Sequence, residues 1–173
     1  MFKILSINPG STSTKFAVYE DETLICLHTI RHTKTDLKPF KSLFEQYEFR
    51  KNLMLKKLNS DGIDISGLSA VVGRGGLVRP LESGVYEVNE KLISDLKSSQ
   101  RGEHVSNLGG LIAHEIAEKI PGCKAFIADP VVVDAAYRTE CPIHVHDQQR
   151  RDYHKGVVKV SVPGFGTITF PGR

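Results

Sequence analysis

The sequence lacks the features that identify several classes of protein. Its three cysteines, Cys26, Cys123 and Cys141, are odd in number and too widely spaced for a disulfide framework or a paired zinc site. No apolar run approaches the roughly eighteen residues that a membrane helix needs, and Met1 leads into a strand-like segment without a signal-peptide pattern. We therefore expect reduced thiols, with Cys26 and Cys123 in the core, no membrane partner and a cytoplasmic location.

A strong excess of positive charge is also missing. The net charge is +3, the pI is about 8.7, and the basic residues are scattered over most of the chain. Only the stretch 149–159, with Tyr153 for stacking, favours nucleic-acid binding, and it matches no recognised module. We expect no nucleic-acid partner. The 40% of apolar and 25% of charged residues instead indicate a soluble globular domain with or without a tail.

The most informative segment is a polar turn between two strand-like runs at residues 2–8 and 15–19. Gly10 lets the backbone approach a ligand closely, because it has no Cβ. The run from Ser11 to Thr14 supplies hydroxyl donors, and Lys15 adds a compact positive charge. The turn is therefore expected to bind phosphate or a nucleotide. The residues expected to do so are Asn8, Gly10, Ser11, Ser13 and Lys15.

This turn is not a Walker A loop, because that motif has a second glycine just before its lysine and a helix directly after it. Here Thr14 precedes Lys15, and the chain continues as a strand. An ordinary polar hairpin turn remains the alternative interpretation.

The rest of the pattern predicts strands and helices in alternation. A third strand is expected at 23–30, and apolar residues then recur with helical spacing from Phe40 to Asn59, where Asp61-Gly62 ends the helix. Two further helices are expected, and their candidate N-caps are Asn89 and either Ser106 or Asn107. Short strands are expected at 68–72, 85–88 and 124–128. The order predicts an α/β fold with a mixed β-sheet and flanking helices.

Arg74 is a candidate anion-binding residue. It follows an apolar strand and lies between Gly73 and Gly75-Gly76, which can leave room for a ligand. A guanidinium can hold a carboxylate or phosphate at two points. An arginine in a surface turn is the alternative interpretation.

His104 and Asp129 occupy two further positions where ligands commonly bind. His104 precedes a helix start, whose amino end favours anions, although a neighbour of the helix cap fits the same pattern. Asp129 follows an apolar strand, and a carboxylate there suits Mg²⁺. An aspartate that only begins a turn with Pro130 is the alternative.

Several segments, in the same order, resemble the amino-terminal domain of the butyrate kinase family, and the resemblance covers about residues 1–135. The segments are residues 2–19, Ala70–Gly76, Val88–Glu90, Gly102–Gly110 and Phe126–Asp134. The resemblance implies a single ribonuclease H-like domain of the superfamily that contains acetate kinases, sugar kinases and actin. It also implies that Arg74, His104 and Asp129 are catalytic and that Asp129 binds Mg²⁺.

The resemblance implies phosphate transfer between ATP and a short-chain carboxylate, with butyrate and ATP giving butyryl phosphate and ADP. The pKa of such an acid lies near the roughly 4.3 of glutamate, so the substrate is ionised at neutral pH and needs no base. Catalysis must instead overcome repulsion between two anions. The implied cofactors are ATP/ADP and Mg²⁺, and the implied partner is a short-chain carboxylate or an acyl phosphate.

We expect residues 136–173 to be a tail that does not match the family, and the family's second kinase domain to be absent. We expect a truncated form with impaired activity, because closure of two domains positions both anions and excludes water. Apolar surface left exposed would favour a homo-oligomer. The alternative is a noncatalytic phosphate- or partner-binding domain of the same fold.

Overall fold

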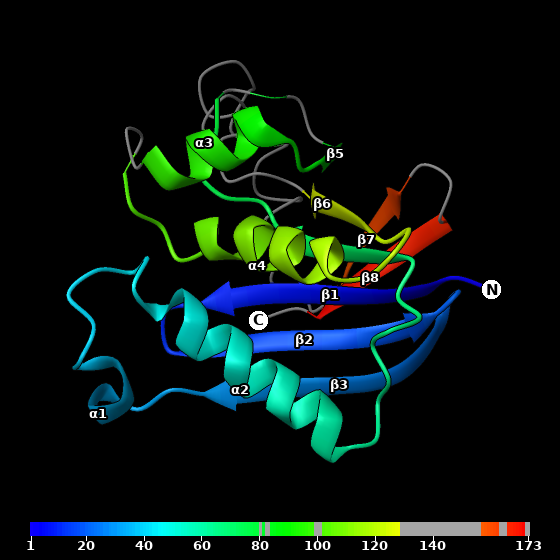
Figure 1. The fold of residues 1–173 in the computed structure, drawn as a ribbon, viewed down its shortest axis with the longest axis horizontal. Helices are drawn as coiled ribbons and strands as arrows, with labels where there is room; N and C mark the ends of the chain where they lie inside the picture. The colour runs from blue at the N-terminus through cyan, green and yellow to red at the C-terminus, as the bar shows by residue number, and fades with distance from the viewer. Residues whose placement is uncertain (80, 82–83, 99–101, 129–156, 163–165, 172–173) are drawn as a thin grey trace, which may run out of the picture.

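A six-stranded mixed sheet forms the centre of the protein (Figure 1). The structure, a computed structural model, describes residues 1–79, 81, 84–98, 102–128, 157–162 and 166–171. The strands of the sheet follow the order β3-β2-β1-β4-β6-β5. Their bounds are β1 (Lys3–Gly10), β2 (Ser13–Glu20), β3 (Thr23–Arg31), β4 (Ala70–Arg74), β5 (Val85–Glu87) and β6 (Lys124–Ala128).

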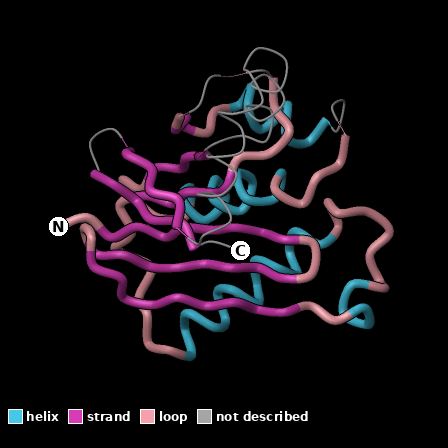
Figure 2. The backbone as a smooth tube through the Cα atoms, turned by 180° about the vertical axis from the view of Figure 1, so that it is seen from behind, coloured by secondary structure: helices cyan, strands magenta, loops and turns pink. Residues whose placement is uncertain are grey.

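Two long helices cover one face of this sheet, and a hairpin lies on the other (Figures 1 and 2). In the hairpin, β7 (Val157–Val162) pairs antiparallel with β8 (Gly166–Pro171), and β8 lies against β1 and β2. The helices are α1 (Lys34–Leu37), α2 (Gln46–Ser60), α3 (Glu90–Ser98) and α4 (Asn107–Glu118). The two long helices on the sheet are α2 and α4.

The direction of the strands decides where a ligand site can form. β4 is parallel to both β1 and β6, so the carboxyl ends of these three strands meet at one edge of the sheet. β2 returns antiparallel from that edge, which places the turn between β1 and β2 there as well. Ligands of open α/β sheets bind at such an edge. We refer to it as the carboxyl edge.

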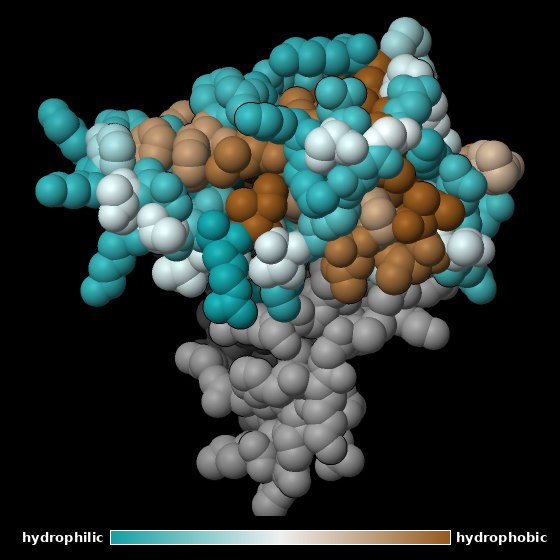
Figure 3. All heavy atoms as spheres, turned by 90° about the horizontal axis from the view of Figure 1, so that it is seen from below, coloured by the Kyte–Doolittle hydropathy of each residue, from teal (hydrophilic) through white to brown (hydrophobic). Residues whose placement is uncertain are grey.

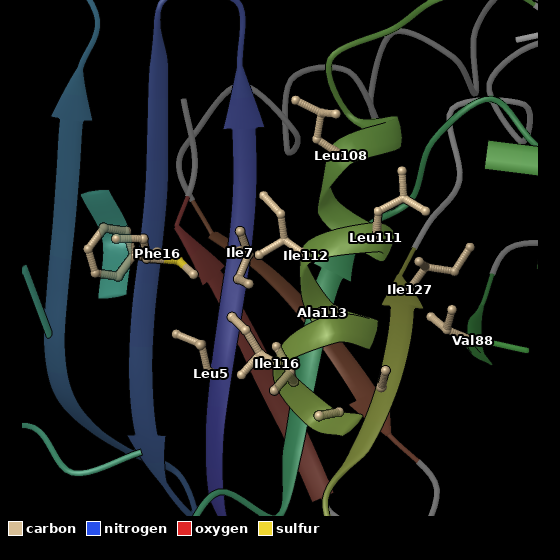
Figure 4. Close-up of a cluster of buried hydrophobic side chains, with 14 of the residues drawn as sticks. Leu5, Ile7, Phe16, Val88, Leu108, Leu111, Ile112, Ala113, Ile116 and Ile127 are labelled. Carbon is tan, nitrogen blue, oxygen red and sulfur yellow. The ribbon is translucent and has the colours of Figure 1, made fainter. Parts of the chain in front are cut away.

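The core lies between the sheet and the two long helices (Figure 4). Apolar side chains of α4 point onto the sheet, where they meet alternate residues of β1 and β6. Fully buried examples are Ile7, Ile112 and Ile127. A smaller cluster, which includes Ile4, Val72 and Phe126, occupies the opposite face. This alternation is the two-residue period of strands that are buried on both faces.

Most predicted elements are present with bounds close to the expected ones, and two capping predictions are confirmed. The side chain of Asn89 accepts a hydrogen bond from the Leu92 amide (3.0 Å), and Gly62 has a φ of 71° just after α2. That conformation favours glycine and ends the helix. Ser106 is the N-cap of α4, but its side chain makes no capping hydrogen bond.

The predicted start of the first long helix, at Phe40, is wrong. The helix α2 begins at Gln46, and the short helix α1 precedes it. Side chains in the intervening segment bond to the backbone: Glu45 accepts from the Lys41 amide, and Ser42 accepts from the Glu45 amide. Such local bonds compete with helical ones, which delays the start of the helix.

The cysteines that the structure describes are unpaired, as expected. Cys26 and Cys123 are half-buried and pack against the core, rather than lying fully inside it. Burial raises the pKa of the Cys123 thiol to about 11, which keeps it protonated at neutral pH. Cys141 lies outside the described residues. Among the helices that the structure describes, none has the length and apolar character needed to cross a membrane.

Candidate anion-binding site

Three predicted site residues lie side by side at the carboxyl edge. β1 lies between β2 and β4 in the sheet, and Asn8 of β1 pairs directly with Lys15 of β2. On the β4 side Ile7 pairs with Gly73, so Arg74, the next residue of β4, lies beside Asn8. Side chains at paired positions share a face of the sheet. Asn8, Lys15 and Arg74 therefore project from the face opposite to α2 and α4.

The amino end of α4 approaches the same edge very closely. A Cβ on Gly73 would lie 2.2 Å from the carbonyl carbon of Gly109, and a Cβ on Gly109 would lie 2.7 Å from the carbonyl oxygen of Arg74 and 3.4 Å from Pro9. A Cβ on Gly76 would similarly meet the side chain of Asn107 at 2.5 Å. The space beside Gly73 and Gly76 is therefore filled by α4, not left for a ligand as the sequence suggested. These glycines bring the helix onto the strand ends.

The turn between β1 and β2 presents some of its hydroxyls and buries another. Ser11 and Thr12 are exposed, and Ser13 is half-buried. Gly10 is close to the Ser13 hydroxyl, since a Cβ on Gly10 would lie 3.3 Å from it. The Thr14 hydroxyl is buried and bonds to His32 and Arg50, so it does not face a ligand as the hydroxyls of Ser11 and Thr12 can.

A buried arginine that the sequence analysis did not identify lies behind this turn. Arg50 of α2 is fully buried and donates hydrogen bonds to the carbonyl oxygens of Gly10, Ser11 and Ser13. It also donates to the hydroxyl of Thr14 (3.2 Å). The sequence contains one indication that this arginine is buried. The apolar stripe of the predicted helix runs from Tyr47 to Met54, and its spacing needs a core position at 50 or 51, where the sequence has Arg50 and Lys51.

His104 lies just before α4, at the same edge. Its Nδ1 is 2.6 Å from the Ser106 hydroxyl and accepts a hydrogen bond from the Ser106 amide (3.3 Å). Because the amide can only donate, Nδ1 is the acceptor and the proton lies on Nε2. The imidazole is thus held in the tautomer that can donate from Nε2.

Asp129, the predicted Mg²⁺ ligand and catalytic residue, lies outside the described residues, as does most of the basic stretch 149–159. Within the described part of the chain, no group of three or more histidine, cysteine or acidic side chains could hold a metal ion. The described residues at the carboxyl edge are instead amide, hydroxyl, imidazole and cationic groups. Their chemistry suits an anion rather than a metal ion.

Comparison with known sequences identifies relatives for most of the chain. It is 54% identical to butyrate kinase 2 of Clostridium acetobutylicum over 133 residues, and 51% identical to butyrate kinase 1 of the same organism over 134 residues. The matches cover 77% and 78% of this chain but only 37% and 38% of the relatives, so the chain spans less than two fifths of their length. The resemblance to an amino-terminal segment of butyrate kinases is confirmed. No model of a known protein family matches the chain.

Comparison with solved structures shows the same fold in acetate kinases. The acetate kinase of Entamoeba histolytica aligns with a TM-score of 0.50 at 17% identity, and that of Porphyromonas gingivalis with a TM-score of 0.50 at 16% identity. The alignments cover 84% and 83% of this chain and 40% of each kinase. The predicted α/β fold, a mixed sheet with flanking helices, is confirmed, and these acetate kinases share it.

Proposed function

We propose that this chain is the phosphate-binding part of a carboxylate kinase of the butyrate kinase type, which transfers phosphate between ATP and a short-chain carboxylate. The observation that carries the proposal is the register that sets Asn8, Lys15 and Arg74 side by side at the carboxyl edge. The identity of 54% to a butyrate kinase supports the substrate class. Because the match covers only 37% of that relative, the activity is proposed for a protein that also contains the other part of the butyrate kinase chain.

The proposed reaction is a phosphoryl transfer between two anionic substrates. A carboxylate oxygen of the substrate attacks the terminal phosphorus of ATP, a new O–P bond forms, and the bond to ADP breaks with its electron pair going to ADP. The substrates repel each other, so the cationic groups of Lys15 and Arg74 lower the barrier by reducing that repulsion. Arg74 is suited to hold the carboxylate or the transferred group at two points, and Nε2 of His104 to donate a hydrogen bond to a phosphoryl oxygen.

The polar turn is proposed to hold the phosphates of the nucleotide through Gly10, Ser11 and Ser13. Mg²⁺ would neutralise phosphate charge in such a reaction, and Asp129 remains the residue we propose to bind it. A cytoplasmic location likewise stays a prediction.

The proposal is tested with a chimera in which residues 1–128 replace the matching segment of butyrate kinase 2 of Clostridium acetobutylicum. In a hydroxamate assay we expect the chimera to form butyryl phosphate from ATP and butyrate. Arg74→Ala should lower kcat/KM by about 100-fold or more, since it removes a charge that acts on the transition state. Arg79→Ala is the matched control, because Arg79 is exposed and pairs only with Asp95 among the described side chains.

Equal turnover in the two arginine variants would show that Arg74 has no catalytic role. The 173-residue chain assayed alone should be slow, since its match spans only 37% of butyrate kinase 2 and transfer requires both substrates to be enclosed. If it binds phosphate and a turnover-competent chimera cannot be obtained, the noncatalytic phosphate-binding alternative is favoured.

A further inference from the structure

The guanidinium of Arg50 makes an unusual set of contacts behind the polar turn. Its Nη1 lies 2.8 Å from the carbonyl oxygen of Gly10 and 3.0 Å from that of Ser13, and its Nη2 lies 3.1 Å from that of Ser11. Nε and Nη2 both donate to Oε1 of Gln46, one helical turn earlier, at 3.1 and 2.8 Å. Every nitrogen of the fork is therefore bonded, and three of the bonds fix the backbone of the turn.

These contacts determine which way the peptide groups of the turn face. In a trans peptide, the carbonyl of one residue points opposite to the N–H of the next, and no cis peptide is present in the described chain. With the carbonyls of Gly10 and Ser11 directed at Arg50, the N–H groups of Ser11 and Thr12 are directed away from it. Carbonyl oxygens that would repel an anion are turned inward, and amide donors are turned outward. Successive amides that face outward are a common anion-binding arrangement.

Among the residues that the structure describes, no carboxylate pairs with the positive charge of Arg50. None of the ion pairs formed by the described residues involves Arg50, whose partners are carbonyls, the hydroxyl of Thr14 and the amide of Gln46. Burial lowers the pKa of Arg50 to about 10, so it remains charged at neutral pH. Burial and the charge of Arg50 lower the pKa of the neighbouring His32 to about 4, so that imidazole is neutral. A buried cation without a counter-charge favours an anion bound nearby.

We propose that Arg50 is a positioning residue of the anion site, which orients the turn at residues 10–14 and supplies uncompensated positive charge directly behind it. The anion is a phosphate group, either free or part of a nucleotide or acyl phosphate. This inference rests on the proposed function for the identity of the ligand.

The test separates orientation from charge by means of two substitutions in the 173-residue chain. Gln46→Glu places a carboxylate where the amide now accepts from Arg50, so it neutralises the charge and leaves the fork in place. Arg50→Lys keeps the charge and removes the fork. The matched control is Asn52→Asp, which makes the same charge change at an exposed position of α2. The first readout is amide exchange in the turn, followed at the buried His32 amide, which donates a hydrogen bond to the Thr12 carbonyl (2.9 Å). The second is the Kd for inorganic phosphate by calorimetry.

We expect Gln46→Glu to weaken phosphate binding by about tenfold while amide exchange in the turn stays within about twofold of the wild type. Arg50→Lys should speed exchange of the His32 amide by about tenfold, because the turn carbonyl that it bonds is held less firmly, and should weaken phosphate binding as well. Asn52→Asp should change neither readout by more than about twofold.

The inference is overturned if Gln46→Glu binds phosphate as Asn52→Asp does, or if Arg50→Lys leaves exchange in the turn unchanged. It is also overturned if the wild-type chain shows no phosphate binding at all. If circular dichroism shows that Arg50→Lys does not fold, Gln46→Glu decides the outcome by itself. Amide exchange requires neither ATP nor turnover, so a failed kinase assay of the chimera would count against the proposed function without deciding this inference.

Discussion

Glycines at the carboxyl edge act through their missing side chains. Gly73 and Gly109 face each other across the contact between β4 and α4, and neither position has room for a Cβ. The close approach that results brings the amino end of α4 to the strand ends where Arg74 lies. At this scale, a hydrogen atom in place of a methyl group decides the shape of the site.

Gly73→Ala should therefore destabilise the protein by about 3 kcal/mol, because its methyl group would overlap the backbone of Gly109, which cannot move without shifting α4. Urea unfolding followed by circular dichroism measures this change. Gly67→Ala is the control, since nothing lies within 4 Å of its Cβ. We expect that variant to match the wild type or to be slightly more stable. Equal midpoints for the two variants would contradict the packing described here.

The two long helices are joined by a cluster of charged and polar side chains around Glu115. Glu115 of α4 accepts hydrogen bonds from Tyr47 and Lys51 of α2 and from Lys119, the C-cap residue of α4. Partial burial raises the pKa of Glu115, but the bonds from Lys119, Lys51 and Tyr47 outweigh this and lower it to about 2. Because Arg50 is on the same helix as Tyr47 and Lys51, this cluster also supports the element that holds the turn.

This cluster should make stability depend on pH. A carboxylate whose pKa is lowered by folding contributes stability above its ordinary value of 4.5, and that contribution is lost as the pH falls toward 2. Glu115→Gln should lower the free energy of unfolding at pH 7 by about 1 to 2 kcal/mol and flatten its decline below pH 4.5. Thermal unfolding between pH 2.5 and 7 measures both effects.

Glu118→Gln provides the control for this prediction, because Glu118 is exposed and pairs only with His114 among the described side chains. Its pH profile should follow that of the wild type. A wild-type slope that persists in Glu115→Gln would show that other carboxylates cause the acid instability.

At the scale of the whole molecule, one edge of the sheet is exposed and apolar. β3 is the outermost strand, and Leu24, Ile25 and Leu27 are 47%, 40% and 50% exposed. Figure 3 shows apolar side chains gathered on the side of the molecule seen from below, where β3 lies in Figure 1. An exposed, apolar edge strand can pair with another chain.

We expect the 173-residue chain to self-associate as its concentration rises from about 1 to about 100 μM, which sedimentation velocity would measure. Leu27→Lys should shift the distribution toward the monomer, because a charge on the edge opposes strand pairing. Thr23→Lys, also exposed on β3, is the control for added charge alone. A chain that stays monomeric throughout would contradict the homo-oligomer predicted from the sequence.

The sequence by itself determined the order of the elements, the polar turn and the choice of Asn8, Lys15, Arg74 and His104 as candidates. These features depend on local physics: the period of apolar residues, the turn preference of glycine and the chemistry of each side chain. Only the tertiary structure decided that Arg50 lies behind the turn, because that contact joins residues about 40 positions apart. It also decided that Thr14 and the glycines beside Arg74 serve packing, since burial depends on what the rest of the chain places against a residue.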